Sequence, residues 1–255
     1  MQTQCQLENF RVLYQDEALV AMHKPAALLV HRSPIDKHET QFALQLTRDL
    51  LDRHVYPVHR LDKATSGLLL FALDAKSASH LGEQFRQHSI QKTYAALVRG
   101  WTAEEGIIDK PLLYQKDSYG DRDKQTASEP QEAWTAYRTL GQSTLDKALG
   151  SYSQQRYSLL QLTPKTGRKH QIRRHLNGIS HPIIGDVNYG DRHHNHLFND
   201  WRGYHRLYLA ATALRFVHPI HKHPMTLNAP LQNDFVQTLE NLNLTCALQH
   251  LHTPF

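Results

Sequence analysis

The sequence predicts an α+β fold in which helices flank a mixed, largely antiparallel β-sheet. Three observations support this class: apolar runs with strand character are short, few segments have helical periodicity, and most connections are of hairpin length. A regular alternation of strands and helices, typical of parallel sheets, is absent. The 255 residues, 40% of them hydrophobic, can bury a sizeable core, and no repeat or linker divides them. We therefore expect one domain over 1–255, with its core at about 10–230.

The first elements are a hairpin and an amphipathic helix. Phe10–Tyr14 and Leu19–His23 are predicted strands, and the polar pair Asp16-Glu17 between them favours a turn. Over Thr40–Arg53, apolar residues recur at four-residue spacing, which predicts a helix.

The later elements follow from the same periodicities. Further expected strands are Val55–His59, Leu68–Leu73, Thr93–Val98, Gly106–Leu113, Trp134–Leu140, Tyr157–Leu162 and Leu207–Val217. One expected helix has Ala78, Leu81 and Phe85 on its apolar face, and a short one over Gln171–Gly178 is ended by glycine. The charged stretch Gln115–Gln131 is expected to be an exposed loop.

Charge and cysteine content favour a cytoplasmic protein and permit an anionic partner. The formal charge of +5 is compatible with a polyanion but does not require one. Cys5 and Cys246 are far apart in the chain and form no CxxC pair, so we expect free thiols in a reducing compartment. No secretory signal is found, and no apolar run has the length of a membrane span. We expect no membrane attachment.

One polar segment has the composition of an active site. His59 to Gly67, HRLDKATSG, places a carboxylate, two cations, two hydroxyl groups and a glycine between two apolar strand runs. Functional groups on a loop with rigid flanks can be aimed at a ligand, and glycine permits a close backbone approach. The alternative is a solvated turn in which Asp62 and Thr65 bind local backbone groups.

This segment resembles HRLDxxTSG, the signature of the RluA-like branch of the pseudouridine synthases, and every fixed position is present. Further blocks resemble the family in the same order: YQDEALVAMHKP, QKTYAALVRG, TPKTGRKHQIRRHL and HPIIGD. They span roughly residues 10 to 190. The resemblance implies the pseudouridine synthase catalytic fold and an isomerase that converts uridine to pseudouridine in RNA. It implies no cofactor and no metal.

The resemblance assigns the chemistry to three residues. Asp62 matches the family nucleophile, a carboxylate that attacks the ribose or the base while the uracil is detached, turned and rejoined through carbon. Arg173 matches the basic residue that pairs with this aspartate, although such a side chain can also bind phosphate or face solvent. Tyr94 matches the tyrosine that lies against the target base, although a single tyrosine in a strand is usually part of the core.

Binding residues follow from the same blocks. Arg60 matches the residue that helps to displace the target nucleotide from its stack. Lys24 is a weaker match, because relatives commonly carry a glycine shortly after the Lys-Pro pair, whereas this chain has Ala26-Ala27, which a positive φ would strain. The cations expected to contact RNA are Arg60, Lys24, Lys165, Arg168, Lys169 and Arg174, although a charge run is usually a solvated face. The residues expected to wall the pocket are Leu61, Thr65, Ile172 and Leu176.

The expected RNA is tRNA. The segments Arg32–Asp36, with the pattern RSxxD, and His194–Phe198 are most similar to a subfamily that modifies the uridine at tRNA position 65. Ribosomal RNA is the alternative substrate, because close relatives with nearly the same motifs modify it. Only about nine residues precede the first block, so we expect no S4-type RNA-binding domain, and we infer no obligate protein partner.

Two interpretations from other classes stay open. Zinc is suggested by two histidine clusters, His193, His194 and His196, and His218, His221 and His223. Neither cluster has a HExxH motif or a cysteine partner, and both are expected in polar loops. The second interpretation is a catalytically silent RNA-binding module, which the complete set Asp62, Tyr94 and Arg173 opposes.

Overall fold

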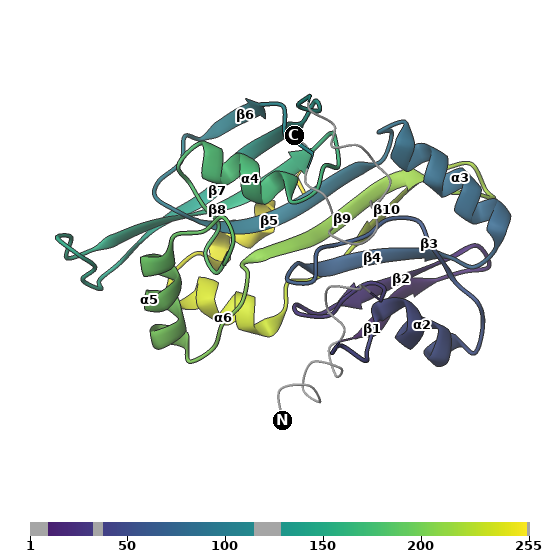
Figure 1. The fold of residues 1–255 in the computed structure, drawn as a ribbon, viewed down its shortest axis with the longest axis horizontal. Coiled ribbons are helices and arrows are strands. Elements are labelled where there is room, and N and C mark those ends of the chain that lie inside the picture. Colours follow the sequence, from purple (N-terminus) through teal and green to yellow (C-terminus); the bar gives the residue numbers. More distant parts are fainter. Residues whose placement is uncertain (1–9, 33–37, 115–128, 254–255) are drawn as a thin grey trace.

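A computed structural model describes residues 10–32, 38–114 and 129–253. Its strands form one ten-stranded sheet with the central order β1-β2-β4-β9-β5-β8-β7-β6, to which β10 adds beside β9 and β3 beside β4 (Figure 1). The strands are β1 (Arg11–Gln15), β2 (Leu19–Lys24), β3 (Tyr56–Pro57), β4 (Ser66–Ala72), β5 (Gln91–Arg99), β6 (Glu105–Asp109), β7 (Trp134–Leu145), β8 (Gln155–Pro164), β9 (Leu209–Val217) and β10 (Pro224–Asn228). All these pairings are antiparallel except that of β4 with β9. The predicted fold class is confirmed.

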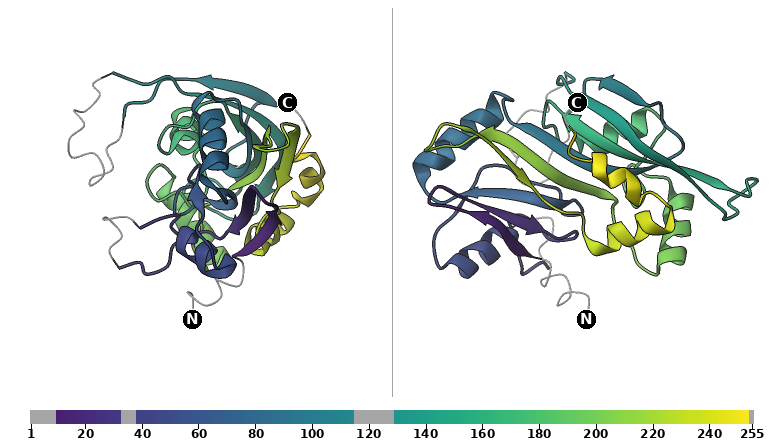
Figure 2. Two further views of the ribbon diagram at one scale, coloured as in Figure 1. Left: turned by 90° about the vertical axis from the view of Figure 1, so that its right-hand side faces the viewer. Right: turned by 180° about the vertical axis from the view of Figure 1, so that it is seen from behind.

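Helices cover both faces of the sheet. They are α2 (Ala43–Leu51), α3 (Ala75–Arg86), α4 (Gln171–Gly178), α5 (Arg192–Arg202), α6 (Asn233–Asn241) and the 3-10 helix η1 (Thr245–His250). The left-hand view of Figure 2 shows α4 and α5 on one side of the sheet, with α6 and η1 on the other. No helix in the described part of the chain is long and apolar enough to cross a membrane.

The hydrophobic core explains why β4 is a continuous apolar run. Leu69 and Phe71 pack on the side of the sheet that carries Ala43 of α2, whereas Leu68 and Leu70 pack with Leu81 of α3. Because successive side chains of a strand point to opposite faces, a strand with helices on both faces must be apolar at every position. The prediction of a buried strand here is confirmed.

The parallel contact of β4 with β9 brings the glycine of HRLDKATSG, Gly67, against another backbone. Gly67 pairs with Ala211 and has a φ of +108°. A Cβ atom added to Gly67 would lie 2.0 Å from the carbonyl oxygen of Ala211. Only glycine fits this conformation and this approach. The start of β4, and the loop before it, are therefore held against the middle of the sheet.

Most predicted elements are confirmed, and α4 has the predicted bounds, Gln171–Gly178. The sequence interpretation placed His193, His194 and His196 in a polar loop, which is wrong, because they lie on α5. This helix has few apolar residues. Its start is stabilised by the Asp191 carboxylate, which accepts hydrogen bonds from two backbone N–H groups, and its end by Gly203 in the left-handed region.

Other elements were not predicted, or cannot be compared. The late elements β10, α6 and η1 were missed, and β7 and β8 extend beyond the predicted strands. Most of the predicted loop Gln115–Gln131 and most of the Arg32–Asp36 motif lie outside the described residues. Cys246 is a free, exposed thiol, as expected, whereas Cys5 is also outside the described part.

Candidate active site

The loop between β3 and β4 presents Asp62 on a fixed backbone. The N–H of Thr65 donates to the carbonyl oxygen of Asp62 at 3.1 Å, which closes a tight turn. Leu61, only 7% exposed, points into the core and anchors the chain immediately before the carboxylate. The Asp62 side chain keeps 27% of its surface exposed and so can be reached by a ligand.

His59 anchors the beginning of this loop. Its ring stacks on Phe85 with centroids 4.9 Å apart, and its Nε2 accepts a hydrogen bond of 2.9 Å from the N–H of Leu70. Burial, and to a lesser degree the charge of Lys92, lowers the pKa of His59 to about 3. The ring is therefore neutral at physiological pH, as an acceptor at Nε2 must be.

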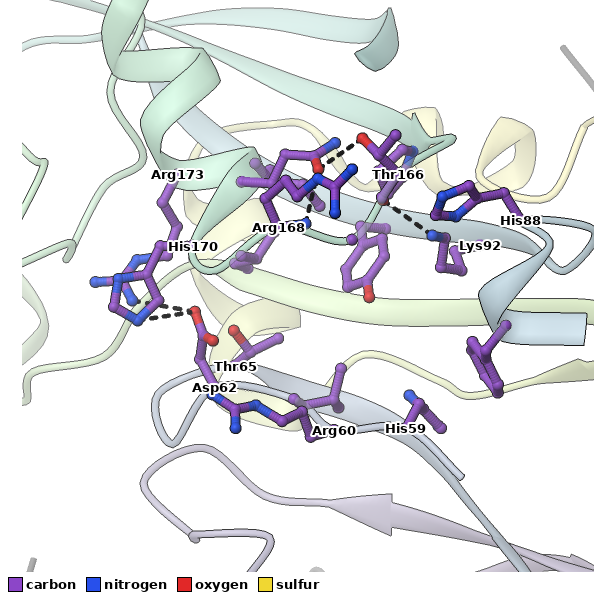
Figure 3. Close-up of a pocket in the computed structure, with 18 of the residues that line it drawn as sticks. His59, Arg60, Asp62, Thr65, His88, Lys92, Thr166, Arg168, His170 and Arg173 are labelled. Carbon is purple, nitrogen blue, oxygen red and sulfur yellow. Dashed lines mark hydrogen bonds and ion pairs between the residues drawn. The ribbon is translucent and has the colours of Figure 1, made fainter. Parts of the chain in front are cut away.

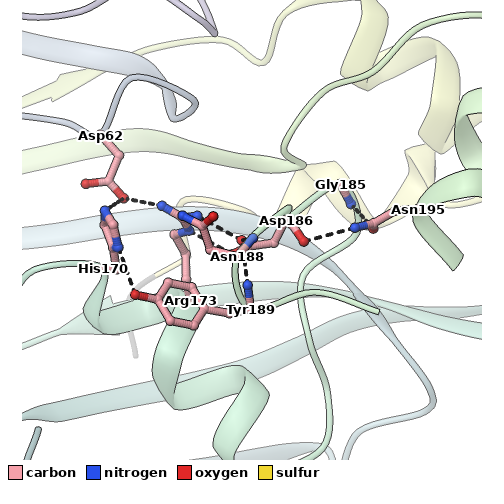
Figure 4. Close-up of polar contacts among 8 residues, drawn as sticks. All are labelled: Asp62, His170, Arg173, Gly185, Asp186, Asn188, Tyr189 and Asn195. Carbon is pink, nitrogen blue, oxygen red and sulfur yellow. Dashed lines mark hydrogen bonds and ion pairs between the residues drawn. The ribbon is translucent and has the colours of Figure 1, made fainter. Parts of the chain in front are cut away.

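Arg173 of α4 lies between two carboxylates (Figure 4). Its Nη1 donates to Oδ2 of Asp62 at 3.1 Å, while Nε and Nη2 donate to Asp186 at 2.7 and 2.8 Å. Arg173 is 5% exposed and Asp186 is 2% exposed. The two carboxylates keep the pKa of Arg173 above its ordinary value although burial opposes the charge. A buried, permanently charged guanidinium therefore faces the candidate nucleophile.

Asp186 is itself held by the chain around it. The N–H groups of Asn188 and Tyr189 donate to its Oδ1 at 2.9 and 3.0 Å, and the Asn195 amide donates to its carbonyl oxygen at 2.9 Å. Burial raises the pKa of Asp186, but the hydrogen bonds and charge of Arg173 and these N–H groups outweigh it, so the pKa lies below its ordinary value. Asp186 is therefore ionised, and it sets the orientation of Arg173.

His170, immediately before α4, is a further neighbour of Asp62. Its Nε2 is 3.8 Å from Oδ2 of Asp62, and its Nδ1 is 3.0 Å from the hydroxyl of Tyr189. Burial lowers the pKa of His170, although the Asp62 carboxylate opposes this shift. Its backbone lies in the left-handed region with a φ of 54°. The adjacent Gln171 accepts hydrogen bonds at Oε1 from the Arg168 N–H and the Thr166 hydroxyl, which fixes the loop that leads into the helix.

A cavity of about 350 Å³ opens beside Asp62 (Figure 3). Tyr94 of β5 lies in its wall, and burial, with a smaller effect of the Asp62 charge, raises the pKa of its phenol. The phenol is therefore protonated at neutral pH. The lining residues are Val58, His59, Arg60, Leu61, Asp62, Thr65, Phe85, His88, Lys92, Tyr94, Pro164, Thr166, Gly167, Arg168, His170, Gln171, Ile172, Arg173 and Leu209. A carboxylate, an aromatic ring and several cations thus face one space that can admit a small planar group.

Lys92 is a basic residue of this cavity that was not selected from the sequence. Its Nζ donates to the carbonyl oxygens of Thr166 at 3.0 Å and Lys165 at 3.4 Å, so it connects β5 to the loop before α4. Burial lowers the pKa of Lys92 to about 8. The sequence did offer a signal for Lys92, because it lies two residues before Tyr94 in the KxY pattern.

The structure brings most of the predicted site residues together, and it excludes two. Lys24 was expected to contact RNA, which is wrong: it is 0% exposed, and its Nζ donates to the carbonyl oxygens of Pro25, Leu28 and Lys63. Leu176 was expected to wall the pocket, but it faces the core from α4. Those in the cavity wall are Asp62, Tyr94, Arg173, Arg60, Arg168, Leu61, Thr65 and Ile172. Lys165, Lys169 and Arg174 do not line it.

Ala27 has the strained backbone expected where alanine replaces the glycine that follows the Lys-Pro pair in relatives. Its φ is 66°, in the left-handed region where glycine is favoured. This turn contains Leu28, whose carbonyl oxygen accepts a hydrogen bond from Lys24 at 2.8 Å. The lysine therefore holds a strained turn and has a structural position.

Three residues near Asp62 were missed as site residues. Asp186 ends the HPIIGD block and His170 lies in the TPKTGRKHQIRRHL block, so both were in view, but nothing local marked them as partners of Asp62 or Arg173. Tyr189, whose ring lies 5.2 Å from the Arg173 guanidinium, carried no motif signal.

The histidine clusters have other partners in this structure. The Nδ1 of His194 lies 2.9 Å from the Tyr157 hydroxyl. The Nε2 of His218 lies 3.0 Å from Oδ2 of Asp16, and the Nε2 of His221 lies 2.8 Å from Oε1 of Glu17. Among the residues described, no three histidine, cysteine or carboxylate side chains are arranged to hold a metal ion.

Comparison with known proteins agrees with this fold. Residues 18–178 match the model of the RNA pseudouridylate synthase family. A tRNA pseudouridine synthase C of Vibrio parahaemolyticus is 46% identical over 90% of this chain and 93% of its own. That of Vibrio cholerae is 47% identical over 86% and 90% of the respective chains. The solved structure of human RNA pseudouridylate synthase domain containing 4 has a TM-score of 0.70 and 26% identity, covering 95% of both chains.

The fold, together with these matches, identifies an enzyme that acts on RNA. The chain belongs to the RNA pseudouridylate synthase family. Its activity is that of an RNA pseudouridine synthase, which is an isomerase.

Proposed function

We propose that this enzyme converts a uridine of tRNA, the uridine at position 65, to pseudouridine with Asp62 as the nucleophile. Relatives named tRNA pseudouridine synthase C support the choice of tRNA, because they match nearly the whole chain at 46 and 47% identity. The position within tRNA follows from the subfamily resemblance. The observation that carries the catalytic assignment is the 3.1 Å contact of the Asp62 carboxylate with Arg173 beside the cavity.

In this proposal, the guanidinium of Arg173 holds the Asp62 carboxylate beside the cavity through its 3.1 Å hydrogen bond. The carboxylate oxygen attacks the ribose or the base and later leaves, so that one difficult step becomes two easier ones. The bond from ribose to the uracil nitrogen breaks, and a bond from the same ribose carbon to a ring carbon forms. The proton lost from that ring carbon is balanced by one gained at the ring nitrogen. Nothing is oxidised or reduced.

The other lining residues are proposed to bind and orient the base. Tyr94 stacks against the uracil, with Leu61, Thr65 and Ile172 as further walls. The Tyr94 phenol is already protonated and cannot accept the proton of the uracil ring carbon, so Tyr94 acts as a hydrogen-bond donor to the base.

The cations are proposed to hold the displaced strand. Arg60 occupies the place that the everted nucleotide leaves, and Arg168, together with Lys165, Lys169 and Arg174, contacts flanking phosphates. We propose that this catalytic domain selects its own RNA and works in the cytoplasm, where tRNA is modified.

The substrate is tested with the purified protein and separate pools of unmodified tRNA and ribosomal RNA, followed by mapping of pseudouridine. The expected product is a single pseudouridine at tRNA position 65. A product in ribosomal RNA alone would overturn the tRNA assignment and support the alternative substrate. RNA binding without any product would indicate the silent RNA-binding module.

The nucleophile is tested with Asp62→Asn, which keeps the shape of the side chain but removes its nucleophilic charge. We expect turnover to fall at least about a thousandfold while RNA affinity stays within about threefold, because the lost interaction is made only along the reaction path. The control is Asp109→Asn, an exposed carboxylate on β6. Equal turnover of both variants would remove Asp62 from the mechanism.

A further inference from the structure

A second cavity lies between the turn of the β7–β8 hairpin and the start of α5. Its volume is about 610 Å³, and we call it the hairpin groove. The residues that matter here are Arg99, Trp101, Tyr152, Arg156 and His194. Figure 1 shows the β7–β8 hairpin extending past the rest of the sheet beside α5. The mechanism proposed above uses none of these residues.

The hairpin groove presents aromatic surface to solvent. Trp101 is 45% exposed and Tyr152 is 73% exposed. The indole Nε1 of Trp101 donates to the carbonyl oxygen of Ser143 at 3.0 Å, so the exposed ring has a fixed orientation. Two large aromatic rings gathered in one hollow indicate a binding surface more than scattered exposed residues do.

Cations accompany these rings. The guanidinium carbon of the exposed Arg156 lies 4.4 Å from the ring centroid of Trp101. Arg99 forms a salt bridge with Asp191, the residue that caps α5. A guanidinium packed on an aromatic face is a planar platform on which a nucleobase can stack, and its free N–H groups can bind phosphate. This combination favours unpaired RNA over an apolar protein segment.

One short segment connects the hairpin groove to the catalytic cavity. Asp186 binds Arg173, and five residues later Asp191 binds Arg99. Asn195, on the first turn of α5, donates to the carbonyl oxygen of Asp186 and accepts from the N–H of Gly185. The proposal requires one RNA molecule to span from the catalytic cavity beside α4 to the hairpin groove beside α5, two helices on the same side of the sheet (Figure 2).

We propose that the hairpin groove is a second RNA-binding site, which holds an unpaired nucleotide of the substrate RNA outside the catalytic cavity. The base stacks on Trp101 or Tyr152, and a phosphate of the same nucleotide binds Arg156. The proposal rests on RNA modification, and not on tRNA being the substrate, because its test uses whichever RNA the wild-type enzyme modifies.

The test compares Trp101→Leu and Arg156→Gln with the wild-type enzyme on two substrates. One is the full-length RNA, and the other is a short RNA stem-loop that keeps the target uridine and its immediate neighbours but lacks the rest of the molecule. On the full-length RNA we expect Kd and KM to rise about tenfold for each variant, because Trp101→Leu removes a stacking ring and Arg156→Gln removes a phosphate contact, with kcat within about twofold. On the short RNA stem-loop, Kd, KM and kcat of the variants should equal those of the wild type. Ultraviolet cross-linking of the wild-type complex should attach full-length RNA to the peptide that contains Trp101 or Tyr152.

The matched control is Arg202→Gln, which removes a guanidinium that lies 5.6 Å from the ring of Trp201 at the far end of α5. Tyr152→Ser is a second test of the groove, because so exposed a ring contributes little to folding. If Kd for full-length RNA is unchanged in Tyr152→Ser and Arg156→Gln at a wild-type Tm, the proposal is wrong. An equal loss of affinity in Arg202→Gln would also overturn it, because the effect would then be general charge.

Discussion

Asp186 binds Nε and Nη2 of Arg173 at 2.7 and 2.8 Å, which leaves Nη1 as the guanidinium nitrogen that donates to Asp62, at 3.1 Å. A guanidinium that is hydrogen-bonded at both Nε and Nη2 has a fixed plane, so its Nη1 points in a fixed direction, toward Asp62. Asp186 is therefore a positioning residue that acts through Arg173.

We predict that Asp186→Asn lowers kcat about a hundredfold and the free energy of unfolding by about 3 kcal/mol, because a buried guanidinium loses its charged partner. Single-turnover kinetics and chemical denaturation measure the two effects. Asp191→Asn is the control, since asparagine also caps helices and its partner Arg99 is partly exposed. Asp191→Asn should lower the free energy of unfolding by no more than about 1 kcal/mol and leave kcat unchanged. Equal effects of both changes would contradict the positioning role.

Gly67→Ala should prevent the chain from folding, or lower its free energy of unfolding by at least about 4 kcal/mol. The new Cβ would overlap the Ala211 carbonyl at a φ of +108°. Thermal unfolding with circular dichroism measures this. The matched change is Gly82→Ala inside α3, where the nearest atom is the end of the Arg86 side chain at 3.5 Å, and it should stabilise by up to about 1 kcal/mol. A normally folded Gly67→Ala enzyme would show that the two strands can separate at little cost.

Ala27→Gly should raise the free energy of unfolding by about 0.5 to 1 kcal/mol. The φ of 66° strains alanine, and this relief exceeds the entropy that glycine loses on folding. Urea denaturation is the measurement. Ala26→Gly, next to it but without a positive φ, should be destabilising. The opposite order of the two variants would mean that the turn is not strained.

Lys24 should make stability depend on pH in the alkaline range. Burial lowers its pKa from 10.5 to about 7 in the folded chain. Between these values the unfolded chain binds more protons than the folded one, so stability rises as the pH increases from about 7 to 10.5, with a slope of at most about 1.4 kcal/mol per pH unit. Lys24→Met should remove this rise, whereas exposed Lys76→Met should keep it. Denaturation curves at pH 6, 8 and 10 decide it. A rise that persists in Lys24→Met would assign it to other groups.

Helix α4 and strand β4 could be predicted because their signals are local. A glycine ends α4, and β4 is an uninterrupted apolar run. Helix α5 was missed because its signals, Asp191 and Gly203, flank a stretch with little apolar periodicity. Lys24 and Leu176 were misplaced because a motif gives a residue's type but not the direction of its side chain.

The fold class, the family and the loop that carries Asp62 could all be predicted from local patterns, because periodicity and motifs are properties of neighbouring residues. Which polar groups meet depends instead on the packing of the folded chain. Asp62 and Arg173 are 111 residues apart in the chain, and Lys24 reaches the carbonyl of Lys63 across 39. Such contacts depend on how strands pair and helices pack, and the cost of burying a charge selects the partner once that packing exists.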